Sequence, residues 1–230
     1  MPTVPAGPTR PGPDDPGRAD PAPGAGTGDG TLGPVGARVV LLAGASGSGK
    51  TSVCRRLGLP VLRLDDFYRD GDDPALPHRF GIVDWDHPAS WDREAALDAV
   101  RALCLGAGAA DVPVYDIPTS RRTGTARLDL AGAPVFVAEG IFAAELVASC
   151  TALGVLADAI CLRLHPAVTF GRRLLRDLAE SRKPPLTLVR RGLALARAEP
   201  ALVRGWTASG CRPLPVRATE RRLRELAAVR

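Results

Sequence analysis

Short apolar runs alternate along the chain with longer segments whose apolar residues recur at helical spacing. The runs lie at residues 38–43, 61–64, 135–138 and 159–162 and are largely free of polar side chains. Runs of this kind are typical of strands that are buried on both faces of a parallel sheet. Strands that alternate with helices predict an α/β fold, with a mainly parallel sheet and helices on both of its faces.

Helices are expected at residues 50–57, 91–105, 167–181, 186–198 and 219–229. Ser90 is expected to cap the second of them, with Asp92 near its positive end. Residues 111–117 predict one strand of a small accessory hairpin, and the prolines within 213–216 predict an edge strand. The polar, irregular stretch 65–91 has the composition of a functional loop.

Composition sets residues 1–37 apart, because Pro, Gly, Ala and Asp dominate this segment. Such a segment cannot bury enough apolar surface to order itself, so we predict a disordered tail over 1–37 and one domain over 38–230. No secretory signal and no run of about 18 apolar residues is evident, so a cytoplasmic protein without a membrane partner is expected. The five cysteines form no CxxC pair, which predicts reduced and mostly buried thiols.

The sequence GASGSGKT directly after the first apolar run matches the pattern GxxxxGK[ST] in full. Its glycines let backbone N–H groups turn toward phosphates, and the following helix points its positive end at the same anion. Lys50 would bring a positive charge to the β- and γ-phosphates, and Thr51 a hydroxyl to Mg²⁺. The residues expected to bind ATP here are Gly44, Ala45, Ser46, Gly47, Ser48, Gly49, Lys50, Thr51 and Ser52.

Two acidic residues follow other predicted strands at the same edge of the sheet. Asp65 comes directly after the second run and is placed to accept the proton of an acceptor hydroxyl. Glu139 ends the third run, where a carboxylate can hold Mg²⁺ directly or through water. Each acid alone is also consistent with an ordinary turn residue, and the combination with the glycine-rich loop favours the catalytic interpretation.

Aromatic residues are concentrated between positions 67 and 115, although they make up only 4% of the chain. This clustering indicates a ring-stacking pocket, with a hydrophobic cap over the edge of the sheet as the alternative. Asp86 lies within the cluster and is a candidate for binding sugar hydroxyls. The six aromatic residues concerned are Phe67, Tyr68, Phe80, Trp85, Trp91 and Tyr115.

The last third of the chain is strongly basic, with 16 Arg and Lys against five acids from Arg163 onward. Arg172, Arg173 and Arg176 are spaced to lie on one side of a helix. Such a helix can act as a lid that stabilises charge on a transferring phosphoryl group, whereas a solvated helical face is the alternative.

Taken in order, these motifs resemble the uridine kinase (uridine–cytidine kinase) family, within the phosphoribulokinase-like P-loop kinases. The resemblance covers residues 38–185 and consists of GASGSGKTS, LDDFYRD, WDHPASWD, VPVYDIPTSRR, FVAEGIF and RRLLRDLAESRK. It implies a five-stranded parallel sheet, a β-hairpin over the acceptor site and an arginine-rich lid. It also implies Mg²⁺-dependent transfer of the γ-phosphate of ATP, or of GTP, to the 5′-hydroxyl of a ribonucleoside.

The resemblance assigns roles to individual residues. Asp65 would be the catalytic base and also touch Mg²⁺, with Thr51 and Glu139 completing the surroundings of the metal. The residues implied to bind the nucleoside are Tyr68, Trp85, Asp86 and Tyr115, with Ser120 at the position that reads the base. The lid residues implied to contact the phosphates are Arg173, Arg176, Arg182 and Lys183. Members of the family often assemble as tetramers, so a homo-oligomer is expected.

The chain departs from the family pattern at the hairpin, where Ile117 and Ser120 stand in place of an aromatic residue and a histidine. Two alternatives therefore stay open. One is a P-loop kinase for another hydroxyl compound, such as pantothenate, nicotinamide riboside or a sugar phosphate bound by Arg79, Arg93, Arg121 and Arg122. The other is a non-catalytic protein that binds ATP or nucleic acid, although nucleic acid is not the expected partner of so complete a set of kinase motifs.

Overall fold

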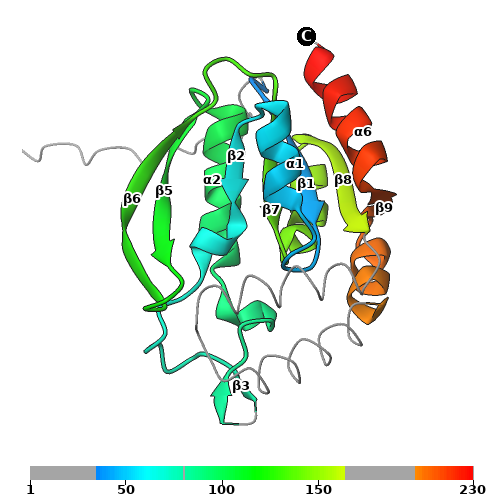
Figure 1. Ribbon diagram of the computed structural model, residues 1–230. Coiled ribbons are helices and arrows are strands. Elements are labelled where there is room, and N and C mark those ends of the chain that lie inside the picture. The colour runs from blue at the N-terminus through cyan, green and yellow to red at the C-terminus, as the bar shows by residue number, and fades with distance from the viewer. Residues whose placement is uncertain (1–34, 80, 164–199, 230) are drawn as a thin grey trace, which may run out of the picture. The chain divides into compact units, whose positions relative to one another are not determined.

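The central element of the fold is a parallel sheet, found in a computed structural model that describes residues 35–79, 81–163 and 200–229 (Figure 1). Its strand order in the described residues is β2–β7–β1–β8–β9, and each neighbouring pair is parallel. The strands are β2 (Val61–Arg63), β7 (Val135–Gly140), β1 (Arg38–Ala43), β8 (Leu156–Arg163) and β9 (Arg212–Pro215). This arrangement confirms the predicted α/β fold, including the proline-containing edge strand.

The middle strand β1 shows why the sheet is covered on both faces. Its side chains alternate between two separate hydrophobic clusters, with Val39, Leu41 and Ala43 in one and Val40 and Leu42 in the other. All five side chains are fully buried. A strand buried in this way has no polar face, and this explains the uninterrupted apolar run in the sequence.

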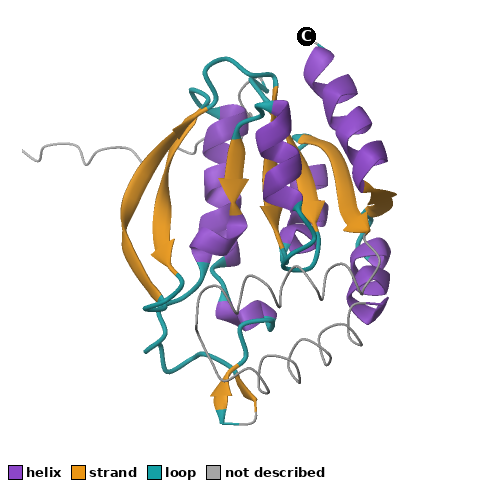
Figure 2. Ribbon diagram, in the orientation of Figure 1, coloured by secondary structure: helices purple, strands orange, loops and turns teal. Residues whose placement is uncertain are grey.

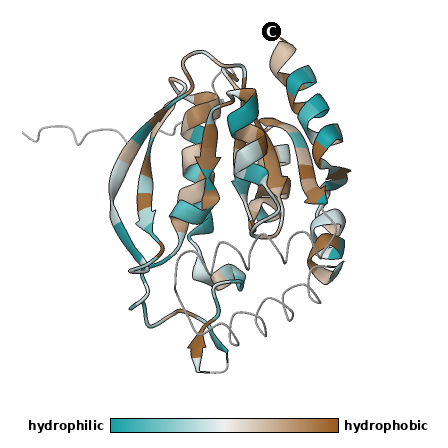
Figure 3. Cartoon of the chain, viewed as in Figure 1, coloured by the Kyte–Doolittle hydropathy of each residue, from teal (hydrophilic) through white to brown (hydrophobic). Residues whose placement is uncertain are grey.

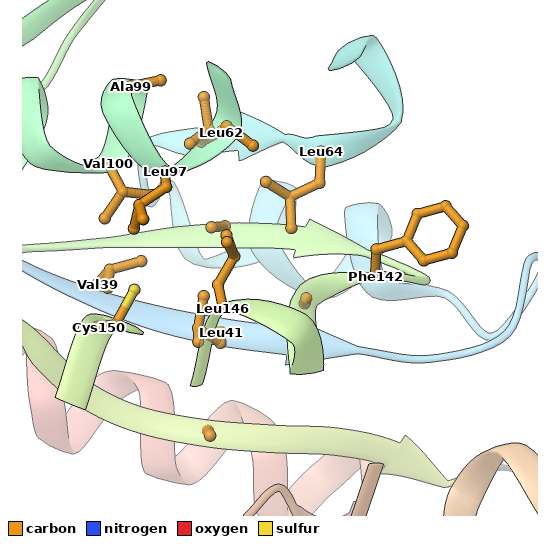
Figure 4. Packing of buried hydrophobic residues seen from close by; sticks show 14 of the residues in the cluster. Val39, Leu41, Leu62, Leu64, Leu97, Ala99, Val100, Phe142, Leu146 and Cys150 are labelled. Carbon is orange, nitrogen blue, oxygen red and sulfur yellow. The ribbon is translucent and has the colours of Figure 1, made fainter. Parts of the chain in front are cut away.

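The larger cluster lies between the sheet and α2 (Arg93–Leu105), the 3₁₀ turn η3 (Ala143–Leu146) and α3 (Val147–Ala152). A further helical stretch at residues 200–208 adds the buried Trp206 to this side. Figure 4 shows the packing of this cluster, with side chains from α2 and from the segment after β7 meeting those of the strands. The residues labelled there are Val39, Leu41, Leu62, Leu64, Leu97, Ala99, Val100, Phe142, Leu146 and Cys150.

The opposite face of the sheet is covered by α1 (Lys50–Leu57) and α6 (Val216–Ala228) (Figure 2). Val53 and Cys54 of α1 and Leu223 of α6 are the buried members of these helices in the second cluster. The rest of α6 is mostly hydrophilic, as its colouring in Figure 3 shows. Arg56 donates hydrogen bonds to Glu220, which ties the two helices together at the surface.

An antiparallel hairpin of β5 (Ala109–Asp116) and β6 (Arg121–Asp129) stands beside α2, near the edge of the sheet formed by β2 (Figure 1). It confirms the accessory hairpin predicted at 111–117. The connection from β2 to α2 contains η1 (Leu64–Phe67), the short pair β3 (His78–Arg79) and β4 (Ile82–Val83), and η2 (Pro88–Ser90).

Helix α2 begins two residues later than predicted, and its cap is different. Asp92 is the N-cap residue, and its carboxylate accepts a hydrogen bond from the Ala95 N–H at 3.0 Å. The Ser90 hydroxyl donates instead to the carbonyls of Trp85 and His87, so the prediction that Ser90 caps α2 was wrong. The second strand also ends earlier than predicted, because Leu64 already belongs to η1.

Several predictions fall on residues that the structure does not describe. The tail up to residue 34 and the helices expected at 167–181 and 186–198 lie outside the described residues. Gly36 and Ala37, the last residues of the expected tail, donate hydrogen bonds to the Cys104 carbonyl at the end of α2. Among the described helices, none has both the length and the apolar character that crossing a bilayer requires.

Candidate active site

The glycine-rich loop between β1 and α1 has a backbone conformation that favours glycine at several of its positions. Gly47 and Gly49 adopt φ angles of 81° and 93°, in the left-handed region that side chains disfavour. At Gly44 a Cβ atom would lie 2.9 Å from the Ser48 hydroxyl and 3.3 Å from the Lys50 side chain. The loop is therefore wound tightly on itself, as expected for a backbone cradle around an anion.

Lys50, the first residue of α1, turns back into this loop. Its ammonium group donates to the Gly44 carbonyl at 2.8 Å and to the Ala45 carbonyl at 3.4 Å. It also lies 3.9 Å from the Glu139 carboxylate, and both side chains are more than nine-tenths buried. The ammonium group is thus held at the loop by two carbonyl oxygens and one carboxylate. The oxygens of a bound phosphate group can take the place of these partners.

Ser48 provides a test of whether the loop suits an anion. Ser48 is 1% exposed, and its hydroxyl oxygen is buried without a hydrogen-bond partner among the described residues. A buried hydroxyl that lacks a partner is costly, and in native structures such groups often belong to sites that bind a ligand or a water molecule. An unused donor inside a positively charged glycine loop fits a phosphate group.

Thr51, the second residue of α1, contacts Glu139, which lies near the end of β7. The Thr51 hydroxyl donates to the Glu139 carboxylate at 2.5 Å, where β1 and β7 run in parallel register. The described residues contain no cluster of three or more His, Cys, Asp or Glu side chains. One hydroxyl and one or two carboxylates nevertheless suit Mg²⁺, which usually keeps several water molecules and shares phosphate oxygens with its substrate.

Asp65 lies in η1, the turn that follows β2, and it is half-buried beside the end of β7. A Cβ atom on Gly140 would be only 3.1 Å from its carboxylate oxygen, so the carboxylate sits directly against the residue that follows Glu139. The structure therefore brings Lys50, Thr51, Asp65 and Glu139 to the carboxyl ends of three adjacent strands. Ligands of open α/β sheets bind at this edge.

Tyr68 is the centre of an aromatic group next to Asp65. Its ring lies 5.5 Å from that of Trp85, 5.8 Å from that of Tyr115 and 6.0 Å from that of Phe142. Burial raises the pKa of the Tyr68 hydroxyl, and the nearby carboxylates of Asp65 and Asp86 raise it further. Of these two acids, Asp65 is half-buried and Asp86 is exposed.

The predicted ring-stacking pocket is smaller than the sequence indicated. Trp91 is 2% exposed and stacks on Phe142 with ring centroids 5.2 Å apart, and Phe67 is also buried in the core. For these two residues the alternative of a hydrophobic cap is correct, whereas Tyr68 and Trp85 remain partly accessible. Phe142 was missed because it lies outside the stretch 67–115 in which the other aromatic residues of the group are concentrated. Phe80 lies outside the described residues.

The tip of the hairpin is tied to the loop after Tyr68. The Tyr115 hydroxyl donates to the Arg69 carbonyl at 3.1 Å, and the Gly71 N–H donates to the Ser120 carbonyl at 2.7 Å. Ser120 has a left-handed backbone with φ 52°, and its hydroxyl donates to the Ile117 carbonyl at 3.4 Å. Burial raises the pKa of Tyr115, while a hydrogen bond with Ser120 lowers it. The described contacts of Ser120 are thus all within the protein, and its contact with a base stays a prediction.

Arg122 was expected only as a candidate for binding a sugar phosphate, and it makes three contacts beside Tyr68. Its backbone N–H donates to Asp70 at 2.7 Å, and its side chain donates to the Tyr68 carbonyl at 3.2 Å and to Asp92 at 3.4 Å. Its neighbour Arg121 donates to Asp72 at 2.7 Å. The paired arginines of the motif TSRR were the available signal in the sequence. The lid residues Arg173, Arg176, Arg182 and Lys183 lie outside the described residues.

Comparison with known sequences gives named relatives. The chain is 36% identical over 168 residues to a uridine kinase from Deinococcus deserti, an alignment that covers 69% of this chain and 77% of that protein. It is 28% identical over 152 residues to a uridine kinase from Staphylococcus aureus, covering 63% of this chain and 69% of the relative. No protein-family model matches the chain.

Comparison with solved structures supports the fold alone, because the sequence identities are low. A candidate fructose transport system kinase from Silicibacter sp. TM1040 matches with a TM-score of 0.53 and 24% identity, over 72% of this chain and 85% of that one. A candidate P-loop kinase from Saccharomyces cerevisiae, which carries a circular permutation, matches with a TM-score of 0.54 and 11% identity. That alignment covers 80% of this chain and 94% of the yeast protein.

Proposed function

The chain belongs to the uridine kinase family and is a small-molecule P-loop kinase, and we propose that its acceptor is a ribonucleoside, either uridine or cytidine. In this proposal the 5′-hydroxyl of the nucleoside receives the γ-phosphate of ATP in the presence of Mg²⁺, with GTP as the alternative donor. Five free and buried thiols fit the cytoplasm, which we propose as the compartment.

The observation that carries the proposal is the arrangement around Tyr68. A half-buried aromatic group lies near two carboxylates, the half-buried Asp65 and the exposed Asp86. A nucleoside needs an aromatic surface for its base, an acceptor for its ribose hydroxyls and a carboxylate for its reacting 5′-hydroxyl. The groups around Tyr68 supply one candidate for each of these three requirements.

In the proposed reaction, Asp65 accepts the proton of the 5′-hydroxyl as that oxygen bonds to the γ-phosphorus and the bond to ADP breaks. Lys50 neutralises negative charge on the phosphates, and the loop amides and Ser48 orient them. Thr51 and Glu139 would hold Mg²⁺, which neutralises charge on the phosphate oxygens when it is bound.

A sugar-phosphate acceptor is supported less well, because all four arginines that could bind a second phosphate already have interactions within the protein. Arg121 pairs with Asp72, and Arg122 with Asp92. Arg93 points to α3, where it donates to the Ser149 hydroxyl at 2.6 Å and also pairs with Glu94. Arg79, the fourth, is exposed in β3. An uncharged acceptor agrees better with these contacts.

The test is ADP formation from ATP and Mg²⁺ with a panel of acceptors. The panel contains uridine, cytidine, purine nucleosides, pantothenate, nicotinamide riboside and sugar phosphates, and it includes 5′-deoxyuridine, which lacks the reacting hydroxyl. We expect uridine or cytidine to stimulate ADP formation, and we expect neither 5′-deoxyuridine nor the Lys50→Ala variant to show this stimulation. Stimulation by another acceptor, with none by pyrimidine nucleosides, would contradict the proposed substrate and leave the kinase fold unaffected.

A further inference from the structure

Two neighbouring strands end beside the predicted site acids, since Glu139 lies in β7 and Asp65 follows β2 in η1. β2 pairs with β7 in parallel register, and the last pair joins Arg63 to Glu139. The next residue of β7 is Gly140, and the next residue of the neighbouring strand is Leu64, which already belongs to η1. The chain after β2 therefore leaves the sheet at Leu64, level with Gly140 of β7, and Asp65 is the next residue of the same turn.

Gly140 has no room for a side chain. A Cβ atom there would lie 2.8 Å from the Leu64 Cβ, 3.1 Å from the Asp65 carboxylate oxygen and 3.7 Å from the Asp65 backbone nitrogen. The Leu64 Cβ cannot move by itself, because Leu64 is 1% exposed and is packed into the core beside the end of β7 (Figure 4). Some part of η1 would have to shift.

The backbone of Gly140 does not itself require glycine. It is not among the glycines with positive φ, and it continues the regular pairing of β7 with β1, opposite Ala43. A regular strand residue without positive φ can carry a side chain wherever there is room for one. Space is therefore the reason for glycine here, and Leu64 and Asp65 occupy that space.

We propose that Gly140 is a positioning residue for Asp65. Its missing side chain lets η1 cross the end of β7, so that the Asp65 carboxylate sits beside Glu139 and the glycine-rich loop. This inference rests on the proposed function, because it gives Gly140 a role only through Asp65. It also explains why an acid and a glycine occur together as Glu139-Gly140 at this strand end.

The first test is Gly140→Ala, with Gly124→Ala as the matched control. Gly124 lies in β6, has no atom within 4 Å of its Cβ position and has no positive φ. We expect Gly140→Ala to lower kcat by about 10-fold or more, since a displacement of about 1 Å can have effects of that size. The dissociation constant for ATP should stay within about twofold, because Lys50 and the loop are not displaced. The control should change neither quantity.

A double-mutant cycle separates positioning from a general structural effect. In an Asp65→Asn background the base is already lost, so Gly140→Ala should lower kcat much less than it does in the wild-type protein. An equal loss in both backgrounds would contradict the inference, because the alanine would then act independently of Asp65. An unchanged kcat for Gly140→Ala would contradict it as well.

The remaining outcomes are also decisive. If Asp65→Asn keeps its full turnover, the role proposed for Asp65 fails and this inference fails with it, whereas a loss in Asp65→Asn with none in Gly140→Ala refutes this inference alone. Assays at saturating ATP favour the folded state, because the nucleotide binds only to it. A Gly140→Ala protein that is unfolded even under those conditions would contradict the inference, since the glycine would then serve the fold and not Asp65.

Discussion

Lys50 and Glu139 form the most deeply buried pair of charged groups in the candidate site. The lysine is 7% exposed and the glutamate 6%, and their charged atoms are 3.9 Å apart. A buried charge that loses its partner destabilises a protein, by about 3–5 kcal/mol in measured cases. Each residue therefore depends on the other before any nucleotide binds, and Thr51 adds a hydrogen bond to the same carboxylate.

The role of Glu139 at the metal can be tested with Glu139→Gln, which keeps the size of the side chain and removes its charge. We expect the Mg²⁺ concentration at half-maximal activity to rise about 10-fold or more, a usual effect of altering a metal's supporting groups. The measurement is a Mg²⁺ titration of ADP formation, with the exposed Glu145→Gln as control. An unaltered Mg²⁺ dependence would show that Glu139 holds Lys50 and Thr51 in place and does not act on the metal.

The adjacent acids Asp65 and Asp66 allow a matched test of the catalytic base. Asp65→Asn should lower kcat by about 10²-fold or more, the usual range for a lost general base, with ATP affinity preserved. Asp66 pairs with Arg63 at 3.7 Å, and burial raises its pKa, so Asp66→Asn should retain most of the turnover. Single-turnover kinetics measures both variants. Equal losses in the two would contradict the assignment of the base to Asp65.

At the scale of elements, the connection between β2 and α2 is fixed mainly by backbone contacts. The Asp92 N–H donates to the Phe67 carbonyl at 2.8 Å, the Arg69 N–H donates to the Ser90 carbonyl at 2.9 Å, and Tyr68 forms an isolated bridge with Trp91. The two ends of the predicted functional loop are thereby held together. The start of α2 and the aromatic group around Tyr68 consequently form one structural unit.

These backbone contacts explain why the start of α2 and several short elements could not be predicted from the sequence. The sequence predicted that α2 begins at Trp91, although the bridge of Trp91 with Tyr68 holds it in an extended conformation. The pair β3–β4 has two residues in each strand and leaves no periodic signal. Helix α3 has only six residues and directly follows η3. It is too short to show a clear helical period in the sequence, so it was also missed.

Asp92 can be tested as the cap of α2. Asp92→Ala should lower the free energy of unfolding by about 1 kcal/mol, the usual cost of losing an N-cap, with a small addition from the lost contact with Arg122. Urea denaturation gives this value, and the control is Asp98→Ala, whose exposed side chain pairs, within the described part of the chain, with Arg101 on the same helix. A similar loss in both variants would mean that the cap contributes nothing specific.

At the scale of the whole molecule, the fold class and the location of the candidate site could be predicted because both follow from short motifs. Lys50 and Asp65 lie in the segments that follow β1 and β2, Glu139 lies near the end of β7, and parallel strands end at one edge. Strand order could not be predicted, since it depends on long-range crossovers. The crowding at Gly140 was also hidden, because it arises from the register between β2 and β7.

The buried thiols predict how the stability of the whole protein changes at alkaline pH. All five cysteines are buried, and burial raises the pKa of Cys54, Cys104 and Cys211 from the ordinary value of 9.0 to about 12. Above pH 9 the unfolded chain therefore releases protons that the folded protein retains. The free energy of unfolding should fall as the pH rises from 9 toward 12.

Urea denaturation as a function of pH checks this expectation. Cys104→Ala should weaken the dependence on pH, since one buried thiol no longer contributes to it. A free energy of unfolding that stays constant above pH 9 would show that the thiols ionise as easily in the folded protein as in the unfolded chain.

Transfer of phosphate to a nucleoside is measured most directly with ATP labelled in its γ-phosphate, mixed with uridine, Mg²⁺ and the full-length protein. We expect the label to appear in uridine 5′-monophosphate, and we expect no labelled nucleoside with 5′-deoxyuridine or with Asp65→Asn. Label that is released only as inorganic phosphate, or that stays in ATP while uridine is saturating, would contradict the assignment of this protein as a nucleoside kinase.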